Sequence, residues 1–257
     1  MKRCRFCGKE KPALIKAHII PRSFFKLVRG DAKYSTELRA SENAVTREAL
    51  QAGYSDDDIL CEECESKFTP YDTHGFAVFT KVFENQNIYR DPNEFECAYL
   101  LPDVDFRLLK LFVLSVLWRA SVSRLRFYRN VDLGQRHEDK IKSLIASGTI
   151  EGTDDYQFVC SHQKDHPYPK VILEPWKRRI EDINYAQFYL PDVQILVKVD
   201  KRPLPDFLRK IMVTSKPPHY IVLFPYKGSN EADYFEGMKA TIRAAKMSAK
   251  GERQSNR

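Results

Sequence analysis

Two Cys-x-x-Cys pairs, Cys4–Cys7 and Cys61–Cys64, constrain the fold of this chain more than any other feature. Each pair supplies two thiolates from one tight turn, and two pairs complete a sulfur tetrahedron with no open position. That ligand set is typical of structural zinc, so we predict a four-cysteine Zn²⁺ site. Zinc binding would pin a short segment that has too little apolar surface to fold alone. The alternative is two pairs of unliganded thiols.

Cysteine usage and the lack of long apolar segments favour a cytoplasmic protein. The 257 residues contain six cysteines, too few for a disulfide scaffold, and four of them stand at zinc spacing, which indicates a reducing compartment. We interpret Cys97 and Cys160 as small buried apolar residues. The N-terminus opens on charged residues rather than on a signal peptide. The longest apolar run, Leu111–Trp118, is far shorter than the roughly 20 residues that span a bilayer.

The formal net charge of +7 favours a polyanionic partner such as nucleic acid, although a basic surface alone would also explain it. Basic residues crowd the first cysteine pair and the apolar segment after it, where they would contact backbone phosphates without reading sequence. The candidate contacts are Arg5, Lys16, Arg22 and Lys26. A second group is either another phosphate contact or a solvated helix face. It comprises Arg119, Arg124, Arg126 and Arg129.

A histidine, His18, lies between the cysteine pairs in an apolar segment that we predict to be a strand, Ile15–Ile20, ended by Pro21. A single histidine in such a strand is more often a packed core residue than a catalyst. Because the zinc site would hold this segment in place, His18 is nevertheless a candidate general base that takes a proton from water. Phosphodiester hydrolysis would also need a divalent ion to neutralise the leaving oxygen.

These motifs resemble the HNH endonuclease family. The resemblance rests on Cys-x-x-Cys, His-Ile-Ile-Pro from His18, and Ile-Leu-Cys-x-x-Cys-Glu from Ile59, and it covers about residues 1–75. The stretch from His18 to Lys26 also resembles the HNH segment of RNA-guided CRISPR nucleases. The family implies a fold of two strands and a helix around a metal, and metal-dependent cleavage of DNA, less often RNA. Carried over, His18 is the general base.

The resemblance also implies ligands for a catalytic Mg²⁺ or Mn²⁺, and here the chain departs from the family. Ala17 stands where the family usually has an Asp or His ligand. The family's Asn before the second cysteine pair is replaced by Asp56, with Asp57, Asp58 and the more distant Asn43 as alternatives. The last ligand corresponds to Glu65, with Asp72 and His74 as substitutes if the helix continues. Carboxylates suit either ion.

We predict an α+β protein with two parts. Residues 1–90 form an HNH-like ββα-metal domain with the zinc site, and residues 91–257 form a helical and β-rich accessory domain of unknown role. Residues 29–58 read as a long loop with one short helix over Thr46–Gln51. Helices are predicted from Cys64 to Pro70, and over residues 76–83, 105–126, 137–147, 203–210 and 229–250. Asp103 or Asp105 would cap the third of these. Strands are predicted over residues 157–160, 170–173, 186–190, 193–199 and 219–225.

Three functional hypotheses follow. The first is a metal-dependent endonuclease that hydrolyses phosphodiester bonds of DNA, with RNA as an open alternative, of the kind that serves bacterial restriction or phage defence. The second is a catalytically inactive, zinc-stabilised module that binds nucleic acid or protein, with Ala17 marking a dead site. The third is a toxin-like nuclease that stays silent until a partner arrives. A protein partner or a second copy of the chain remains open, and no membrane partner is expected. The enzyme predicts that His18, Glu65 and an aspartate converge.

Overall fold

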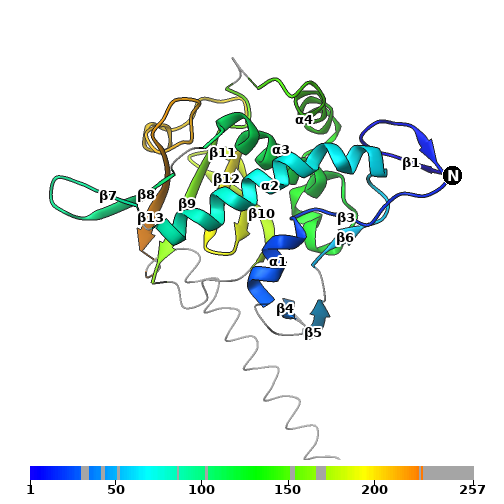
Figure 1. Cartoon of the computed structure of the whole chain (residues 1–257), viewed down its shortest axis with the longest axis horizontal. Coiled ribbons are helices and arrows are strands. Elements are labelled where there is room, and N and C mark those ends of the chain that lie inside the picture. The colour runs from blue at the N-terminus through cyan, green and yellow to red at the C-terminus, as the bar shows by residue number, and fades with distance from the viewer. Residues whose placement is uncertain are drawn as a thin grey trace, which may run out of the picture.

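The computed structural model describes residues 1–29, 35–41, 44–50, 53–85, 87–101, 104–150, 154–165, 172–225 and 227. Helices cover one face of a mixed sheet, and the N-terminal hairpin lies near the N-terminal end of the long helix α2 (Glu62–Asn85) (Figure 1). The fold is therefore α+β, as the sequence predicted. No helix in the described part of the chain is long and apolar enough to cross a bilayer.

Seven strands of the described residues form the main sheet, in the order β10-β11-β12-β9-β13-β8-β7. Neighbours are antiparallel except β13 and β9, which run parallel. The strands are β7 (Ile88–Arg90), β8 (Glu96–Leu101), β9 (Phe158–Lys164), β10 (Leu173–Ile180), β11 (Ile183–Leu190), β12 (Val193–Lys198) and β13 (His219–Pro225). Tight turns with positive φ at Asp182 and Asp192 join β10 to β11 and β11 to β12, which is the backbone geometry of short hairpins. Of the predicted strand 170–173, the first two residues lie outside the described part of the chain, and Leu173 is where β10 begins.

Alternation along β11 divides the sheet into two buried faces. Ala186, Phe188 and Leu190 belong to the main core beneath the helices. Ile183 and Tyr185 point to the other face, where a smaller cluster packs under the segment that carries α5 (Asp206–Arg209). Because both faces are covered, the strand is buried almost throughout.

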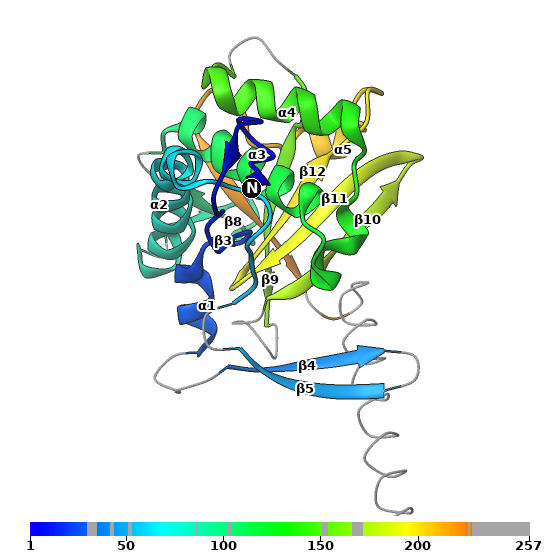
Figure 2. The same cartoon turned by 90° about the vertical axis from the view of Figure 1, so that its right-hand side faces the viewer.

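Helix α3 (Phe106–Val122) lies between the sheet and helix α2 (Glu62–Asn85) (Figure 2). Asp105 caps α3, because its carboxylate accepts from the main-chain N–H of Leu108 at 3.0 Å. The alternative cap Asp103 lies outside the described residues. Every residue of α3 from Leu109 to Ala120 is buried, which explains its nearly uninterrupted apolar sequence.

Helix α2 is continuous, so the predicted break at Pro70 is wrong. Pro70 removes one helical hydrogen bond at a cost of about 3 kcal/mol. Packing against α3 offsets that cost, because Phe68 stacks on Trp118 and Phe79 packs on Phe112. The two helices come very close at Gly75, where a Cβ would lie 2.3 Å from the Phe112 ring.

The remaining helices and strands agree with the sequence-based predictions to different degrees. Helix α4 (Gln135–Ser147) ends at Gly148, whose φ of 64° is the left-handed cap expected of glycine. It is preceded by a 3₁₀ turn, η1 (Arg126–Val131). The predicted helix Thr46–Gln51 is wrong: β4 (Ser35–Ser41) and β5 (Ala44–Leu50) form an antiparallel hairpin there (Figure 2). The predicted helix 229–250 lies outside the described residues.

The N-terminal part consists of short paired strands. Strand β1 (Lys2–Arg3) pairs with β2 (Glu10–Lys11), and β3 (Ala17–His18) pairs with β6 (Ser55–Asp56). Helix α1 (Arg22–Arg29) follows β3, and α2 follows β6. The core is continuous across residue 90, since one buried cluster contains Phe6 and Phe68 as well as Trp118 and Phe188.

Candidate metal centre and adjoining histidine site

The four cysteines Cys4, Cys7, Cys61 and Cys64 come together, with all their sulfur atoms within 4.8 Å of one another. The Sγ atoms of Cys7 and Cys61 lie 3.9 Å apart. A tetrahedral zinc ion with bonds of about 2.3 Å separates its sulfur ligands by roughly 3.8 Å. The site therefore fits a metal such as zinc, and none of these cysteines is in a disulfide.

Two local structures hold the thiols in place. In the first, Gly8 donates its main-chain N–H to the Cys4 carbonyl at 2.9 Å, and its φ of 74° closes the turn. In the second, Cys61 directly precedes α2, and its carbonyl accepts from the N–H groups of Cys64 and Glu65 at 3.0 Å. The Cys61 N–H donates to the Cys4 sulfur at 3.4 Å, which joins the two structures. The positive end of the α2 dipole favours thiolates here.

The thiol pKa values show why four such groups need a cation. Burial raises the pKa of Cys64 and of Cys61. Burial also raises the Cys4 pKa, but hydrogen bonds from the main chain of Cys7 and Cys61 outweigh it and bring that pKa to about 7. Four thiolates this close repel one another, and a bound Zn²⁺ removes the repulsion by ligating all four.

The metal centre is anchored in the main core by one aromatic side chain. Phe6, between Cys4 and Cys7, meets the edges of Phe68 and Trp118 with ring centroids 5.2 and 5.3 Å away. Lys11 on β2 and Glu63 in the first turn of α2 also form an ion pair at 2.7 Å. The metal centre is thus coupled to α2 and α3 rather than standing alone.

His18 lies on β3, on the opposite face of the β3–β6 pair from Ala17. Ala17 pairs with Asp56, and His18 pairs with Ser55. Because side chains alternate along a strand, Ala17 and Asp56 share one face, which is buried, while His18 and Ser55 share the other, which is half-buried.

Asp56 is engaged in structural hydrogen bonds on its own face. Its Oδ2 accepts from the Ser123 hydroxyl at 2.7 Å and from the Arg124 N–H at 3.3 Å, just beyond the end of α3. Its Oδ1 accepts from the Asp58 N–H at 2.9 Å. The structure therefore places Asp56, a predicted metal ligand, on the face away from His18, where its hydrogen bonds join β6 to the end of α3.

Arg119 is the centre of the site on the His18 side. Its side chain is fully buried, and its guanidinium holds Asp72 through two hydrogen bonds, of 2.6 and 2.9 Å. It also donates to the main-chain oxygen of His18 at 2.7 Å and to the carbonyl of Ser115 at 3.2 Å. One residue of α3 thus fixes both β3 and α2, and the sequence reading of Arg119 as a phosphate contact or solvated residue is wrong. The one feature of the sequence that could have indicated this role is the position of Arg119 within the apolar run of the helix, next to Trp118.

Glu65 and Asp72 lie two turns apart on the same face of α2, and both interact electrostatically with Arg119. Glu65 Oε2 is buried and has no hydrogen-bond partner among the described residues. Burial raises the pKa of Glu65, Arg119 lowers it and Asp72 raises it. Burial likewise raises the pKa of Asp72, against the lowering influence of Arg119 and of His18. His18, Glu65, Asp72 and Arg119 therefore form one electrostatic cluster.

The other predicted ligands lie elsewhere. Asp57 and Asp58 face Lys2, with carboxylate-to-ammonium distances of 3.8 and 3.5 Å. His74 lies beside Asp105 at the start of α3, with a buried Nε2 that has no partner within the described part of the chain. Asn43 falls outside it. Among the described residues, only the four cysteines form a group of three or more donors close enough to share one ion.

The predicted phosphate contacts all lie in the N-terminal part of the chain, between residues 5 and 26. Lys16, Arg22 and Lys26 are exposed, and Arg5 is half-buried.

Comparisons with protein-family models, curated proteins and solved structures give no match. The functional argument for this chain therefore depends on the site itself.

Proposed function

We propose that this chain is a metal-dependent endonuclease of the HNH type, with His18 as its general base. The observation that carries the proposal is the electrostatic cluster of His18, Glu65 and Asp72 around Arg119, next to a closed four-cysteine site. The arrangement of the elements supports it too, since β3 pairs with β6 and α2 follows β6, with α1 and the β4–β5 hairpin inserted between the two paired strands.

The residues of the cluster and the basic residues near it have separate roles in the proposed reaction. The hydrogen bond from Arg119 to the His18 carbonyl fixes the main chain that carries the imidazole, so the ring is oriented before substrate arrives. The half-buried imidazole of His18 takes a proton from the attacking water. Lys16, Arg22 and Lys26 hold the substrate through its phosphates.

Glu65 is the carboxylate best suited to a divalent ion, because its buried Oε2 has no hydrogen-bond partner in the described chain. Asp72 is the second candidate, although Arg119 already engages both of its oxygens. Bound Mg²⁺ or Mn²⁺ would supply charge neutralisation at the scissile phosphate. With Ala17 offering no ligand, waters and substrate phosphate would complete the coordination shell.

A second candidate function is a zinc-stabilised binding module without catalysis. The bidentate pair of Arg119 with Asp72 favours it, because a guanidinium then stands beside the carboxylate that a metal would need. In this alternative the buried arginine replaces the ion as the counter-charge, and the exposed basic residues bind nucleic acid only.

The discriminating experiment incubates the purified protein with supercoiled plasmid and, separately, with RNA, in Mg²⁺ and then in Mn²⁺. We expect nicking that His18→Ala and Glu65→Gln reduce at least a hundredfold. The matched control is Glu84→Gln, which changes an exposed carboxylate near the other end of α2 and should leave the rate unchanged. Undiminished nicking by His18→Ala would remove the histidine from the mechanism. Binding of DNA without cleavage under either ion would favour the binding module.

The cellular role belongs to the same proposal. A nuclease of this kind with a basic surface suits restriction or defence against phage DNA, in a cytoplasm reducing enough to keep zinc-binding thiols free. The segment from 91 to 257 would then add target or partner recognition.

A further inference from the structure

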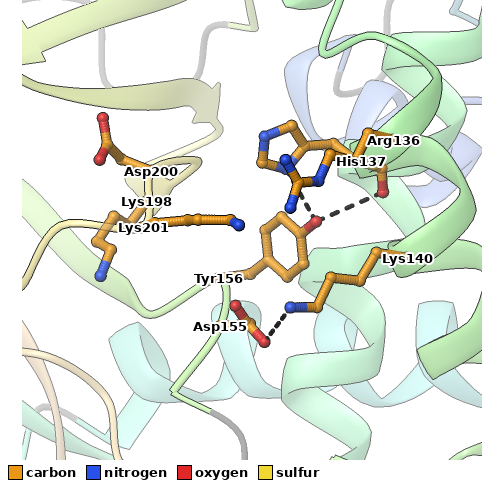
Figure 3. Close-up of a pocket in the computed structure, with 8 residues that line it drawn as sticks. All are labelled: Arg136, His137, Lys140, Asp155, Tyr156, Lys198, Asp200 and Lys201. Carbon is orange, nitrogen blue, oxygen red and sulfur yellow. Dashed lines mark hydrogen bonds and ion pairs between the residues drawn. The ribbon is translucent and has the colours of Figure 1, made fainter.

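A pocket lies where the start of α4 faces the end of β12 and the loop after it, and it shares no residue with the metal centre or the His18 site (Figure 3). Of its eight lining residues five are basic: Arg136, His137, Lys140, Lys198 and Lys201. The three on α4 lie in its first two turns, where the helix dipole also favours an anion. The pocket therefore gathers positive charge from two separate elements.

The two acidic residues of the pocket neutralise only part of this charge, because Asp155 pairs with Lys140 of the pocket and Asp200 pairs with Arg202 outside it. Asp155 accepts from Lys140 at 2.5 Å. Asp200 accepts from the Arg202 side chain at 2.9 Å and from main-chain N–H groups of Arg202 and Asn184. Arg136 and Lys201 form no ion pair within the described residues, so their charge is available to a ligand.

Lys198 is the strongest sign that the pocket is built for an anion. Its side chain is only 5% exposed, and its ammonium donates to the neutral amide oxygen of Gln157 at 3.3 Å. A buried ammonium is costly to keep charged unless an anion compensates for its lost hydration. Burial accordingly lowers the pKa of Lys198, and Asp200 and Asp155 raise it.

The size of the pocket limits what can enter it. Its volume is about 80 Å³. A cavity needs about 10–15 Å³ on the same measure to hold one water molecule, so this pocket has room for a tetrahedral oxyanion. Tyr156 also lines the pocket, and its hydroxyl is hydrogen-bonded to His137 Nδ1 at 3.0 Å (Figure 3).

We propose that this pocket binds a terminal phosphate group, with the rest of the ligand projecting into solvent. A phosphate monoester carries close to two negative charges and several acceptor oxygens, and so matches Arg136, Lys198 and Lys201 better than a carboxylate does. The phosphate belongs either to a free mononucleotide or to the phosphorylated end of a nucleic-acid strand. The inference does not depend on the proposed nuclease activity, since it concerns binding at a separate site.

The test is calorimetric titration of the zinc-loaded His18→Ala protein at constant ionic strength. The ligands are inorganic phosphate, a nucleoside 5′-monophosphate, and one oligonucleotide with either a 5′-phosphate or a 5′-hydroxyl. We expect saturable binding of phosphate and monophosphate, and an Arg136→Ala/Lys201→Ala protein that binds at least tenfold more weakly. Lys177→Ala/Lys216→Ala removes the same charge at exposed positions outside the pocket and should leave affinity unchanged. Lys198→Met serves as a third variant, with its fold checked by circular dichroism.

The outcomes separate the sources of the phosphate. Tighter binding of the 5′-phosphorylated oligonucleotide than of its 5′-hydroxyl form assigns the site to strand ends, and equal binding of the two assigns it to the mononucleotide. Absence of saturable phosphate binding, or equal losses in the pocket and control variants, overturns the proposal. None of these outcomes bears on plasmid nicking, so failure of the pocket and failure of the nuclease remain distinguishable.

Discussion

Arg119 donates to the main-chain oxygen of His18 at 2.7 Å, across 101 positions of sequence. The same guanidinium holds Asp72 on α2, so three separate elements meet at one buried cation. A planar group with five fixed donors can serve a carbonyl and a carboxylate at once, which a lysine ammonium does less well. The position of His18 is thus set from α3 as well as from the cysteine site.

Replacing Arg119 should be strongly destabilising. Arg119→Met leaves the largely buried Asp72 carboxylate without its guanidinium and removes one donor from the His18 carbonyl, so we expect the free energy of unfolding to fall by about 3–5 kcal/mol. The measurement is urea denaturation followed by circular dichroism. The double variant Arg119→Met/Asp72→Leu should recover part of the loss, because the Asp72 carboxylate is removed together with its partner, and the remaining loss includes the effect on Glu65.

The exposed Arg124, close to the end of the same helix, is the control for that series. Arg124→Met should change stability by no more than about 0.5 kcal/mol. A comparable loss in both variants, or a loss below about 1 kcal/mol for Arg119→Met, would contradict the central role given to Arg119.

Removal of zinc should unfold the cysteine-bearing segments, which are the β1–β2 hairpin and the start of α2, and disturb the core that they pack against. We expect one zinc per chain, and Cys61→Ser should lower zinc content and melting temperature together. Because Phe6 connects the metal centre to Trp118, chelation should also change the emission of that tryptophan, measured in a Trp176→Phe background.

Cys97→Ser is the matched control for zinc binding, since Cys97 lies on β8 outside the sulfur cluster. It should retain full zinc and an unchanged melting temperature. A Cys61→Ser protein that melts like the wild type without metal would refute the structural role of the site.

Features with a local signal in the sequence are the ones that could be predicted. The cysteine pairs each close within a few residues, so their spacing alone indicated the metal centre. The cap at Asp105 and the glycine end at Gly148 are likewise properties of a single turn. The apolar run of α3 indicated a core helix because burial on all sides leaves no polar face.

Features set by distant contacts could not be read in this way. The continuity of α2 through Pro70 depends on packing against a helix that follows it in the chain, most closely at Gly75. The face occupied by Asp56 depends on its register against Ala17, which one residue of slippage would reverse. Arg119 is polar, and composition suggested solvent or phosphate as its partner until the fold supplied Asp72 and His18.

Gly75 offers a direct test of the close approach between α2 and α3. Alanine improves helix propensity by about 1 kcal/mol, but the added Cβ would come within 2.3 Å of the Phe112 ring. We therefore expect Gly75→Ala to destabilise the protein by about 1–3 kcal/mol, as overpacking does. In a Phe112→Leu background the same change should cost less or become favourable, and an identical cost in both backgrounds would argue against the contact.

Asp200 should make the stability of the sheet depend on acid. Hydrogen bonds from Arg202 lower the pKa of Asp200 well below its usual range, against the raising effect of burial. The unfolded chain, with an ordinary pKa of about 3.9, then binds the proton first as the pH falls. The contribution of the pair is complete above that value and is lost as the pH falls through the depressed pKa of the folded state. Arg202 is 48% exposed, so solvent screens the pair, and Asp200→Asn should cost about 1 kcal/mol at neutral pH.

That cost should shrink as denaturation is repeated at pH values falling from the unfolded pKa towards the depressed folded pKa, below which neither folded protein carries the charge. Asp182→Asn is the control, since Asp182 is 81% exposed beside Arg179 and its ion pair should contribute little at any pH. A difference between Asp200→Asn and the wild type that stays constant into acid would mean that packing, and not the charge on Asp200, holds the turn after β12. Growth of the difference towards acid would reverse the assigned sign and place the carboxyl in a site that favours its protonated form.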